Sequence, residues 1–298
     1  DVVGLDTMAH VIKTMADTLP GDPWHRFFRT PDWLAALIGK GALGQKTGGG
    51  VYRKAGKDIL VLDIARQDYR PSAQETSADV AAILALRDPA AKFAKLRASS
   101  DPQAQFLWAM FRDLFHYTAY HLADIADTAR DVDFTIRWGY GWKLGPFETW
   151  QAAGWQQIAG WINEDIAAGK AMSKAPLPAW VTDGRKGVHG KDGSYSASAN
   201  ADKPRSQHPV YQRQLFPDPL IGEKFDQGTT VWENEGVRLW TLGGDGVGVL
   251  SFKTKMNTVN DFVLDGVQHA IKLAEEKLKA VVIWQTGEPF SAGADLKG

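Results

Sequence analysis

The chain has 298 residues, of which 44% are hydrophobic and 23% are charged, the balance of a soluble globular protein with room for two modest domains. Thirty-four basic and 35 acidic residues leave a formal charge of -1, so no overall field attracts nucleic acid or an anionic membrane. The absence of cysteine excludes disulfides and thiolate metal sites. No apolar run of about 18 residues predicts a membrane span, and we expect a cytoplasmic protein.

Residues 1–182 read mainly as helices separated by capped breaks. Thr30 is expected to cap a helix that has Pro31 at its first position and Gly39 just past its end. Asp101-Pro102 opens a longer helix in the same way. Spacings of four, four, three and four residues predict a buried stripe along that helix, made of Phe106, Met110, Leu114, Tyr117 and His121.

Two short extended segments interrupt the helices. Residues 51–64 predict a hairpin that turns at 54–57, and residues 188–198 predict a second with Asp192-Gly193 at its tip. Each follows a glycine-broken basic turn, LGQKTGGG in the first case and TDGRKG in the second. A helical block that ends in such a turn and hairpin therefore occurs twice, which suggests a divergent internal duplication.

The pattern changes after residues 184–235, a polar, glycine- and proline-rich stretch that we expect to be a linker. VGVLSF and AVVIWQ are apolar runs of strand length on either side of an amphipathic helix at 260–279. They predict a βαβ unit whose second strand ends at Thr286-Gly287. The predicted buried face of the helix consists of Val263, Val267, Ile271, Ala274 and Leu278.

Two glycine-rich segments approach nucleotide-binding motifs without matching them. GKGALGQKT at 39–47 has Gln45 where a phosphate loop places its lysine, and GYGWKLG at 139–145 is one residue too long for a dinucleotide fingerprint. Neither follows a predicted strand. The sequence therefore predicts no phosphate loop and no nicotinamide site within these residues.

The remaining polar and aromatic clusters favour structural roles. His116 and His121 are five residues apart, about 140° around a helix, so they do not form a metal pair, and we expect core or boundary histidines. An acidic run is expected on a solvated face or at helix caps: Asp124, Asp127, Asp131 and Asp133. A tryptophan-rich stretch is expected to anchor helix packing: Trp138, Trp142, Trp150, Trp155 and Trp161.

SAGAD at 291–295 allows two interpretations. A small residue followed by glycine at the end of a strand lets a ligand carbonyl approach the backbone, where a free N–H can stabilise an oxyanion. The alternative is a tight turn that enters a helix, with Asp295 near the helix start. The spacing alone favours the turn.

GPFETWQAAG at 145–154 and GALGQKTGGGVYRK at 41–54 resemble the C-terminal helical domain of 3-hydroxyacyl-CoA dehydrogenases. DVVGLDTMAHV resembles the stretch that follows the Gly-Pro-Phe-Glu turn in a first copy of that domain, so 145–154 would belong to a second copy. Residues 236–298 resemble the start of the enoyl-CoA hydratase (crotonase) family, through GVGVLSFKTKMNTVN and KAVVIWQTGEPFSAGADLKG. The order matches bifunctional fatty-acid β-oxidation enzymes.

The resemblance implies a mainly α-helical dehydrogenase domain in two divergent copies over 1–183, a linker over 184–235, and a truncated α/β crotonase-like segment over 236–298. In the whole enzyme, hydration of a 2-enoyl-CoA would supply the 3-hydroxyacyl-CoA that is then oxidised with NAD. The implied partners are an acyl-CoA thioester and further copies of the chain in a homo-oligomer.

The resemblance makes Ala292 the first oxyanion N–H donor, with Gly293, Ala294 and Asp295 shaping the acyl-CoA pocket. Both ends of the chain look cut, because the NAD domain would precede it and the catalytic glutamates would follow it. We therefore expect the chain alone to be inactive. The second copy has no asparagine at MFRDLF, which implies a structural role in packing and dimer contact. The alternative is a non-catalytic helical assembly module that carries a vestigial crotonase edge.

Overall fold

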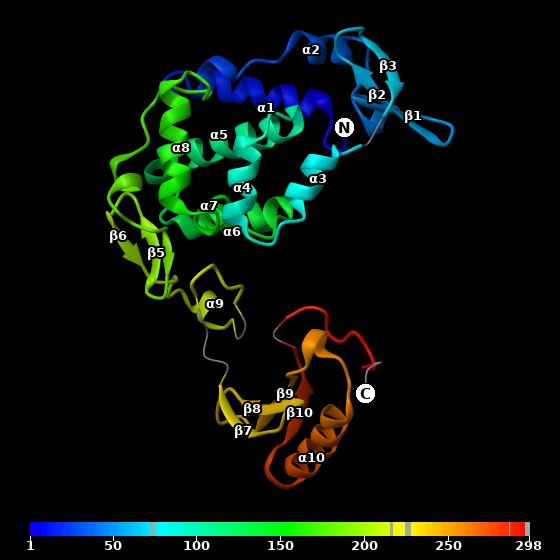
Figure 1. Ribbon diagram of the computed structural model, residues 1–298, viewed down its shortest axis with the longest axis vertical. Coiled ribbons are helices and arrows are strands. Elements are labelled where there is room, and N and C mark those ends of the chain that lie inside the picture. The colour runs from blue at the N-terminus through cyan, green and yellow to red at the C-terminus, as the bar shows by residue number, and fades with distance from the viewer. Residues whose placement is uncertain (73–74, 215–216, 224–227, 286, 296–298) are drawn as a thin grey trace. The chain divides into compact units, whose positions relative to one another are not determined.

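The computed structural model describes residues 1–72, 75–214, 217–223, 228–285 and 287–295 (Figure 1). The chain divides into two units, Asp1–Glu223 and Lys224–Gly298. The first unit is mainly helical and the second contains a sheet with one helix against it. Among the described residues, no helix combines the length and apolarity needed to cross a membrane.

The first unit contains nine described α-helices and two small antiparallel sheets. The helices are α1 Leu5–Thr18, α2 Asp32–Gly39, α3 Ala78–Leu84, α4 Pro89–Ala98, α5 Pro102–Ile125, α6 Ala129–Tyr140, α7 Pro146–Ala152, α8 Trp155–Ala167 and α9 Pro209–Gln212. One sheet consists of β1 Tyr52–Ala55, β2 Asp58–Asp63 and β3 Asp68–Pro71. The other consists of β4 His189–Gly190, β5 Gly193–Ser196 and β6 Ala201–Lys203.

Helix α5 lies at the centre of the helical core, but its buried face is not the predicted one. Asp101 caps the helix as expected, because its carboxylate accepts the N–H groups of residues 103 and 104. The predicted stripe is wrong, since Phe106 is 67% exposed and Met110 is 39% exposed. Helix α5 has apolar residues on more than one face, and its contacts with α4, α6 and α7 cover a different stripe: Ala104, Trp108, Phe115, Ala119 and Leu122.

The tryptophan prediction is confirmed for Trp150 and Trp155 but not for Trp138. Trp150 and Trp155 are buried and stacked, with ring centroids 4.2 Å apart. The Trp155 indole also donates a hydrogen bond to the Val181 carbonyl, which attaches α8 to the segment that follows it. Trp138 is 62% exposed and stacks on Phe134 at the surface.

Two helix starts, of which only that of α2 was predicted, need comment. Helix α2 begins one residue later than expected, with Pro31 as the N-cap and Gly39 as its last residue. Helix α6 begins with a capping box in which Thr128 and Asp131 hydrogen-bond to each other's backbone and side chain. Asp131 therefore serves as a cap, as predicted. Asp133 is fully buried, which contradicts its assignment to a solvated face or a cap.

Both predicted hairpins are present, and each is extended by a third strand. Residues 55 and 58 are paired, so the first hairpin turns at Gly56-Lys57. Residues 190 and 193 are paired, so the second turns at Lys191-Asp192, one residue earlier than predicted. The third strands, β3 and β6, were not predicted, because their short polar sequences lack strand alternation.

The described residues of the stretch 184–235 do not form a plain linker. They include β4–β6 and α9 in the first unit, and β7 Thr229–Glu233 in the second. Glu223, in the last quarter of the stretch, accepts hydrogen bonds from Arg130 on α6 and from Arg205, and its side chain is largely buried. Ion pairs and short strands therefore order a segment whose composition resembles that of a linker.

Two similar modules occur within the first unit; we call residues 1–72 the first module and residues 145–203 the second module. In the first module, the Asp1 carboxylate accepts the backbone N–H of Val51 at 2.9 Å and of Tyr52 at 2.7 Å. Gly50 lies just before these residues, and a Cβ atom there would lie 2.4 Å from Asp1 Oδ1. Glycine is therefore required where the carboxylate meets the start of β1.

The second module repeats this joint with a different side chain. The Gln151 amide oxygen accepts the N–H of Val188 at 2.8 Å and of His189 at 3.0 Å. A Cβ atom at Gly187 would lie 2.1 Å from the same oxygen. Three residues after Asp1 and after Gln151, a glycine with φ near +100° starts a helix, namely Gly4 for α1 and Gly154 for α8. The positive φ explains glycine at both positions.

The second unit has a four-stranded sheet in the order β10-β9-β8-β7. The predicted strand–helix–strand unit is confirmed by β9 Val247–Phe252, α10 Asp261–Lys277 and β10 Ala280–Ile283, with β9 and β10 parallel. Strands β7 and β8 Val237–Thr241, which extend the sheet antiparallel, were not predicted. Helix α10 buries Val263 as expected, but Ile271 is 52% exposed. The predicted end at Thr286 lies outside the described residues.

Candidate functional site

The predicted SAGAD turn is joined to the segment that follows β9. Ala292 donates its N–H to the Met256 carbonyl at 3.1 Å, and Val259 donates to the Gly293 carbonyl at 2.8 Å. Asp295 then donates to the Val259 carbonyl at 2.9 Å, next to a parallel bridge at the neighbouring Ala294. The two segments thus form a short ladder in which the N–H groups of Ala292 and Asp295 and the Gly293 carbonyl are paired.

This geometry bears directly on the expected oxyanion donor. We expected the Ala292 N–H to be unclaimed by any internal carbonyl, and that expectation is wrong for this structure. The Gly293 N–H donates to Ser291 Oγ at 3.1 Å, and the φ of +88° at Gly293 explains the glycine. The pairing supports the interpretation of SAGAD as a structural turn.

The segment opposite the turn has an unusual backbone that the sequence did not reveal. Met256 and Asn257 have consecutive positive φ values of 55° and 52°, a region that residues other than glycine seldom adopt. Asn257 is held from the other side, because its amide donates to the Pro289 carbonyl and its own carbonyl accepts from Ser291. Strained backbone of this kind often occurs at functional sites.

A buried polar line joins α6 to β4 and β5. His189 Nε2 lies 2.6 Å from Asp133 Oδ2, and His189 Nδ1 lies 2.9 Å from Ser194 Oγ. A serine, a histidine and an aspartate that are joined by hydrogen bonds in this way suggest a nucleophilic triad. However, the Asp133 and His189 side chains are 0% exposed and Ser194 is 1% exposed, so the hydroxyl has no access to a substrate.

The same aspartate holds the GPFE turn. Asp133 accepts the N–H groups of Phe147 at 2.8 Å and Glu148 at 3.0 Å, at the start of α7. A Cβ atom at Gly145 would lie 2.3 Å from Asp133 Oδ1, which explains this glycine. Burial raises the pKa of Asp133, whereas the hydrogen bond and charge of His189 act in the opposite direction. These hydrogen bonds hold α6, α7 and β4 together, which is a structural role.

The helical histidines are also packing residues. Trp24 is 3% exposed, and its ring contacts those of His116, Tyr117 and His121 on α5. His116 Nε2 lies 2.8 Å from the Ala175 carbonyl, and burial lowers the pKa of His116. Burial, together with a nearby aspartate, raises the pKa of Tyr117 to about 12. Within the described residues, no group of three histidines and carboxylates could hold a metal ion.

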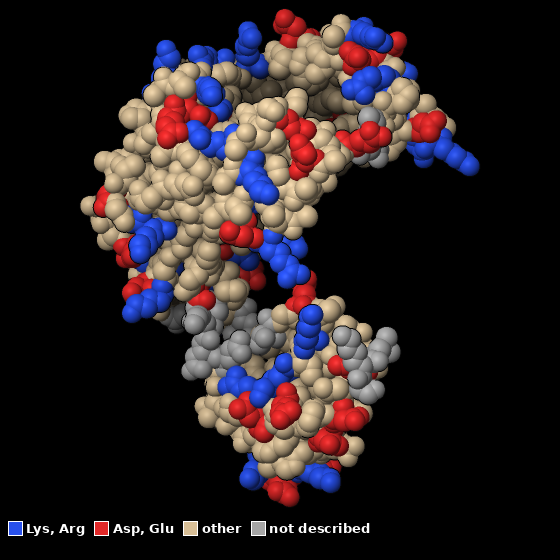
Figure 2. Space-filling view, in the orientation of Figure 1, with Lys and Arg blue, Asp and Glu red and all other residues tan. Residues whose placement is uncertain are grey.

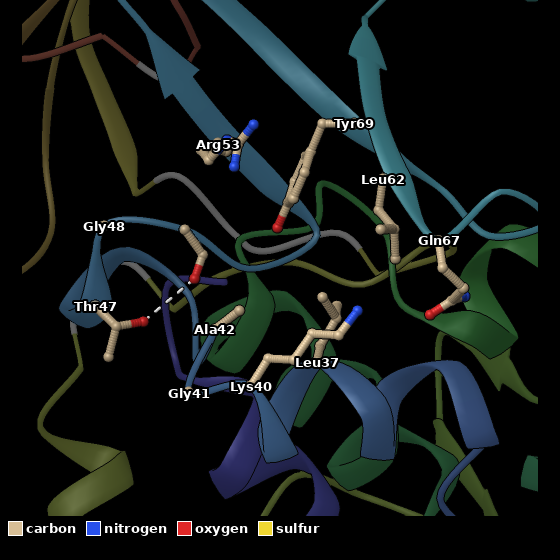
Figure 3. Close-up of a pocket in the computed structure, with 11 residues that line it drawn as sticks. Leu37, Lys40, Gly41, Ala42, Thr47, Gly48, Arg53, Leu62, Gln67 and Tyr69 are labelled. Carbon is tan, nitrogen blue, oxygen red and sulfur yellow. Dashed lines mark hydrogen bonds between the residues drawn. The ribbon is translucent and has the colours of Figure 1, made fainter.

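An open pocket of about 330 Å³ lies beside the first hairpin (Figure 3). Leu37 comes from α2, Lys40 directly follows that helix, and the strands supply Arg53, Leu62 and Tyr69. Figure 3 shows the Lys40 side chain extending between α2 and these strands. The sequence singled out the glycine turn next to this pocket, but not the two cations that line it.

Comparison with known proteins identifies relatives in fatty-acid oxidation. Residues 1–54 match the family of the 3-hydroxyacyl-CoA dehydrogenase C-terminal domain. The chain is 30% identical to a probable 3-hydroxyacyl-CoA dehydrogenase of Bacillus subtilis (strain 168), over 99% of the chain and 36% of the relative. It is 25% and 26% identical to putative fatty acid oxidation complex trifunctional enzymes of Rickettsia prowazekii and Rickettsia felis, over 100% of the chain and 36% of each relative.

The chain thus spans about a third of the length of the curated relatives that it matches. No solved structure matches it. The family match covers α1, α2 and most of β1, which are the residues that carry the dehydrogenase resemblance of the first module. The second module and the second unit lie outside that match.

Proposed function

We propose that the chain is part of a fatty-acid β-oxidation enzyme that joins a 3-hydroxyacyl-CoA dehydrogenase to an enoyl-CoA hydratase in one polypeptide. The observation that carries the proposal is the match of residues 1–54 to the dehydrogenase C-terminal domain. Support comes from relatives named for this activity or for fatty-acid oxidation, which align with nearly all of the chain. Acyl-CoA thioesters are then the substrates and NAD is the oxidant of the whole enzyme.

In this proposal the first and second modules are divergent copies of the dehydrogenase C-terminal domain. The repeated joints at Asp1 and Gln151 support this interpretation, because each accepts the two N–H groups that begin a three-stranded sheet. The second module serves packing and association into a homo-oligomer, and its closed polar line is consistent with a structural role. NAD would be bound by a domain outside these residues.

The second unit, in this proposal, begins the crotonase-like domain, although it starts earlier than residue 236 because β7 belongs to its sheet. Ala292 is the oxyanion donor, and Gly293, Ala294 and Asp295 shape the acyl-CoA pocket. For this role the Ala292 N–H must leave the Met256 carbonyl, so that the thioester oxygen becomes its acceptor. The glycine at 293 provides the backbone freedom for such an adjustment.

Both proposed activities are tested in a longer polypeptide that contains this chain and has the length of its relatives. We expect NADH oxidation with acetoacetyl-CoA and hydration of crotonyl-CoA, each followed by absorbance. Loss of both activities in a folded preparation would refute the proposal. The 298-residue chain alone should catalyse neither reaction, and saturable micromolar binding of NADH, followed by its fluorescence, would contradict the absence of an NAD site.

The oxyanion role is tested by Ala292→Pro, which removes the N–H donor. Hydration should fall by roughly 10²- to 10³-fold, the usual cost of one oxyanion donor. Ala292→Gly keeps the N–H and should retain most of the activity, while circular dichroism establishes that both variants fold. If Ala292→Pro folds and keeps full hydration activity, SAGAD is a structural turn only.

The second candidate is a non-catalytic helical assembly module with a vestigial crotonase edge. The hydrogen bond between the Ala292 N–H and the Met256 carbonyl favours it, because a paired donor cannot stabilise an oxyanion. This candidate predicts that the longer polypeptide oxidises NADH but does not hydrate crotonyl-CoA.

A further inference from the structure

The pocket beside the first hairpin combines an apolar floor with two cations. Leu37 and Leu62 are 3% and 6% exposed, so the floor belongs to the core of the first module. The Tyr69 ring stands in the wall, fixed by a hydrogen bond from its hydroxyl to the Gly50 carbonyl at 2.5 Å. A planar apolar group fits such a floor and wall, and 330 Å³ is at the lower end of the usual size of ligand pockets.

The two cations lack acidic partners in the part of the chain that the structure describes. Arg53 contacts the Tyr69 ring, with its guanidinium carbon 4.1 Å from the ring centroid, but no described carboxylate pairs with it. Lys40, at the end of α2, likewise has no described ion pair or hydrogen bond from its ammonium group. By contrast, Lys46 in the adjacent turn is neutralised by Asp6 at 2.6 Å.

The glycine turn itself offers few free donors to a ligand. The N–H groups of Gly41, Gly48 and Gly49 are bonded to backbone carbonyls, and the Thr47 hydroxyl lies within hydrogen-bond distance of two more. A phosphate loop would instead point such N–H groups at the anion. Recognition in this pocket therefore depends on the side chains of Lys40 and Arg53.

We propose that this pocket binds a phosphate monoester attached to a planar ring, such as a nucleoside monophosphate. Two cations favour a dianion over a monocarboxylate, because a phosphate monoester carries a charge of about -1.5 to -2 near neutral pH. The ring packs on the floor of Leu37 and Leu62. The second module offers no equivalent, since Gly190 stands where the first module has Arg53. The lining side chains carry this proposal independently of the dehydrogenase and hydratase proposals.

Isothermal titration of the 298-residue chain with adenosine 5′-monophosphate tests the proposal. We expect saturable binding that weakens with rising salt, and weaker binding of both adenosine and inorganic phosphate. Lys40→Met and Arg53→Met should each lower the affinity roughly tenfold, the usual effect of removing one charge-assisted hydrogen bond. Lys57→Met, at the tip of the same hairpin and outside the pocket, should leave the affinity unchanged.

Several results would overturn the proposal. They are the absence of saturable binding at millimolar nucleotide, an affinity equal to that of adenosine or of inorganic phosphate, and unchanged affinity in a folded double variant of Lys40 and Arg53. Tighter binding of hexanoate than of the nucleotide would also overturn it in favour of a carboxylate site. Circular dichroism of each variant establishes that a lost affinity is not a lost fold.

Discussion

The two modules of the helical unit share a joint but enclose different interiors. In both, a side chain three residues before a helix-starting glycine accepts two N–H groups at the start of a three-stranded sheet. In the second module, the His189 side chain contacts Asp133, and both side chains are fully buried. The corresponding residue of the first module, Tyr52, is 52% exposed. The backbone of the joint sets the local fold, whereas the side chain of its second residue, Tyr52 or His189, determines whether the interior is closed.

The segment that precedes the sheet also differs between the two modules, and the first module is again the more open one. Helix α2 of the first module has eight residues and leads to the glycine turn at 41–49, and Lys40 and Arg53 line an open pocket there. The second module has only the short 3₁₀ helix Ala179–Thr182 at this point. The second module therefore has no counterpart of α2, and it lacks the pocket wall that would carry a lysine equivalent to Lys40. Similar frameworks can therefore differ in whether they leave an open pocket.

The largest expected effect concerns the side chain of the second residue in each joint, His189 or Tyr52. His189→Ala removes the only side chain that the buried Asp133 carboxylate faces among these contacts and leaves it the two backbone N–H groups of α7, and it should lower the free energy of unfolding by about 3–5 kcal/mol. Tyr52→Ala, at the corresponding exposed position, should cost about 1 kcal/mol or less. Urea unfolding followed by circular dichroism measures both. Equal losses in the two variants would show that the interiors do not differ as described.

The glycine before each joint should give the next largest effect. Gly50→Ala and Gly187→Ala each place a Cβ atom within 2.4 Å of the accepting side-chain oxygen, and each should cost about 1–3 kcal/mol. Amide exchange at residues 51–52 and 188–189 should rise in the respective variants. Gly160→Ala is the control, because its Cβ meets nothing within 4 Å and a helical alanine should stabilise by about 0.4–1 kcal/mol. Unchanged exchange in both joint variants would argue against the shared joint.

The smallest effect concerns the contact between Trp24 of the first module and α5. Burial lowers the pKa of His116 in the folded chain, so the unfolded chain binds the proton more readily. The stabilisation from neutral His116 is therefore complete above about pH 6.5, the unfolded value, and is lost as the pH falls towards the folded pKa. His116→Gln should make the unfolding midpoint less dependent on pH between neutral and mildly acidic conditions. An identical pH profile in the variant would contradict this assignment.

The sequence correctly predicted those local features that depend on a single, local physical cause. Asp101-Pro102 at a helix start, Asp131 as a cap and the βαβ unit all follow from local hydrogen bonding and periodicity. The buried stripe of α5 did not follow, because apolar residues lie on several of its faces and the neighbouring helices decide which is covered. The short strands β3, β6 and β7 did not follow either, because pairing with a neighbouring strand orders a polar segment.

The features of the candidate sites likewise divide into those that the sequence predicted and those that only the structure revealed. The sequence by itself determined the glycine turns, the position of SAGAD after a strand and the repetition of a hairpin after a basic turn, since each depends on neighbours within a few residues. Only the tertiary structure decided that Ala292 donates to Met256, that Asp133 meets His189, and that Lys40 and Arg53 line one pocket. These contacts join residues that are 13 to 56 positions apart, and a local pattern carries no information about which distant groups the packed chain brings together.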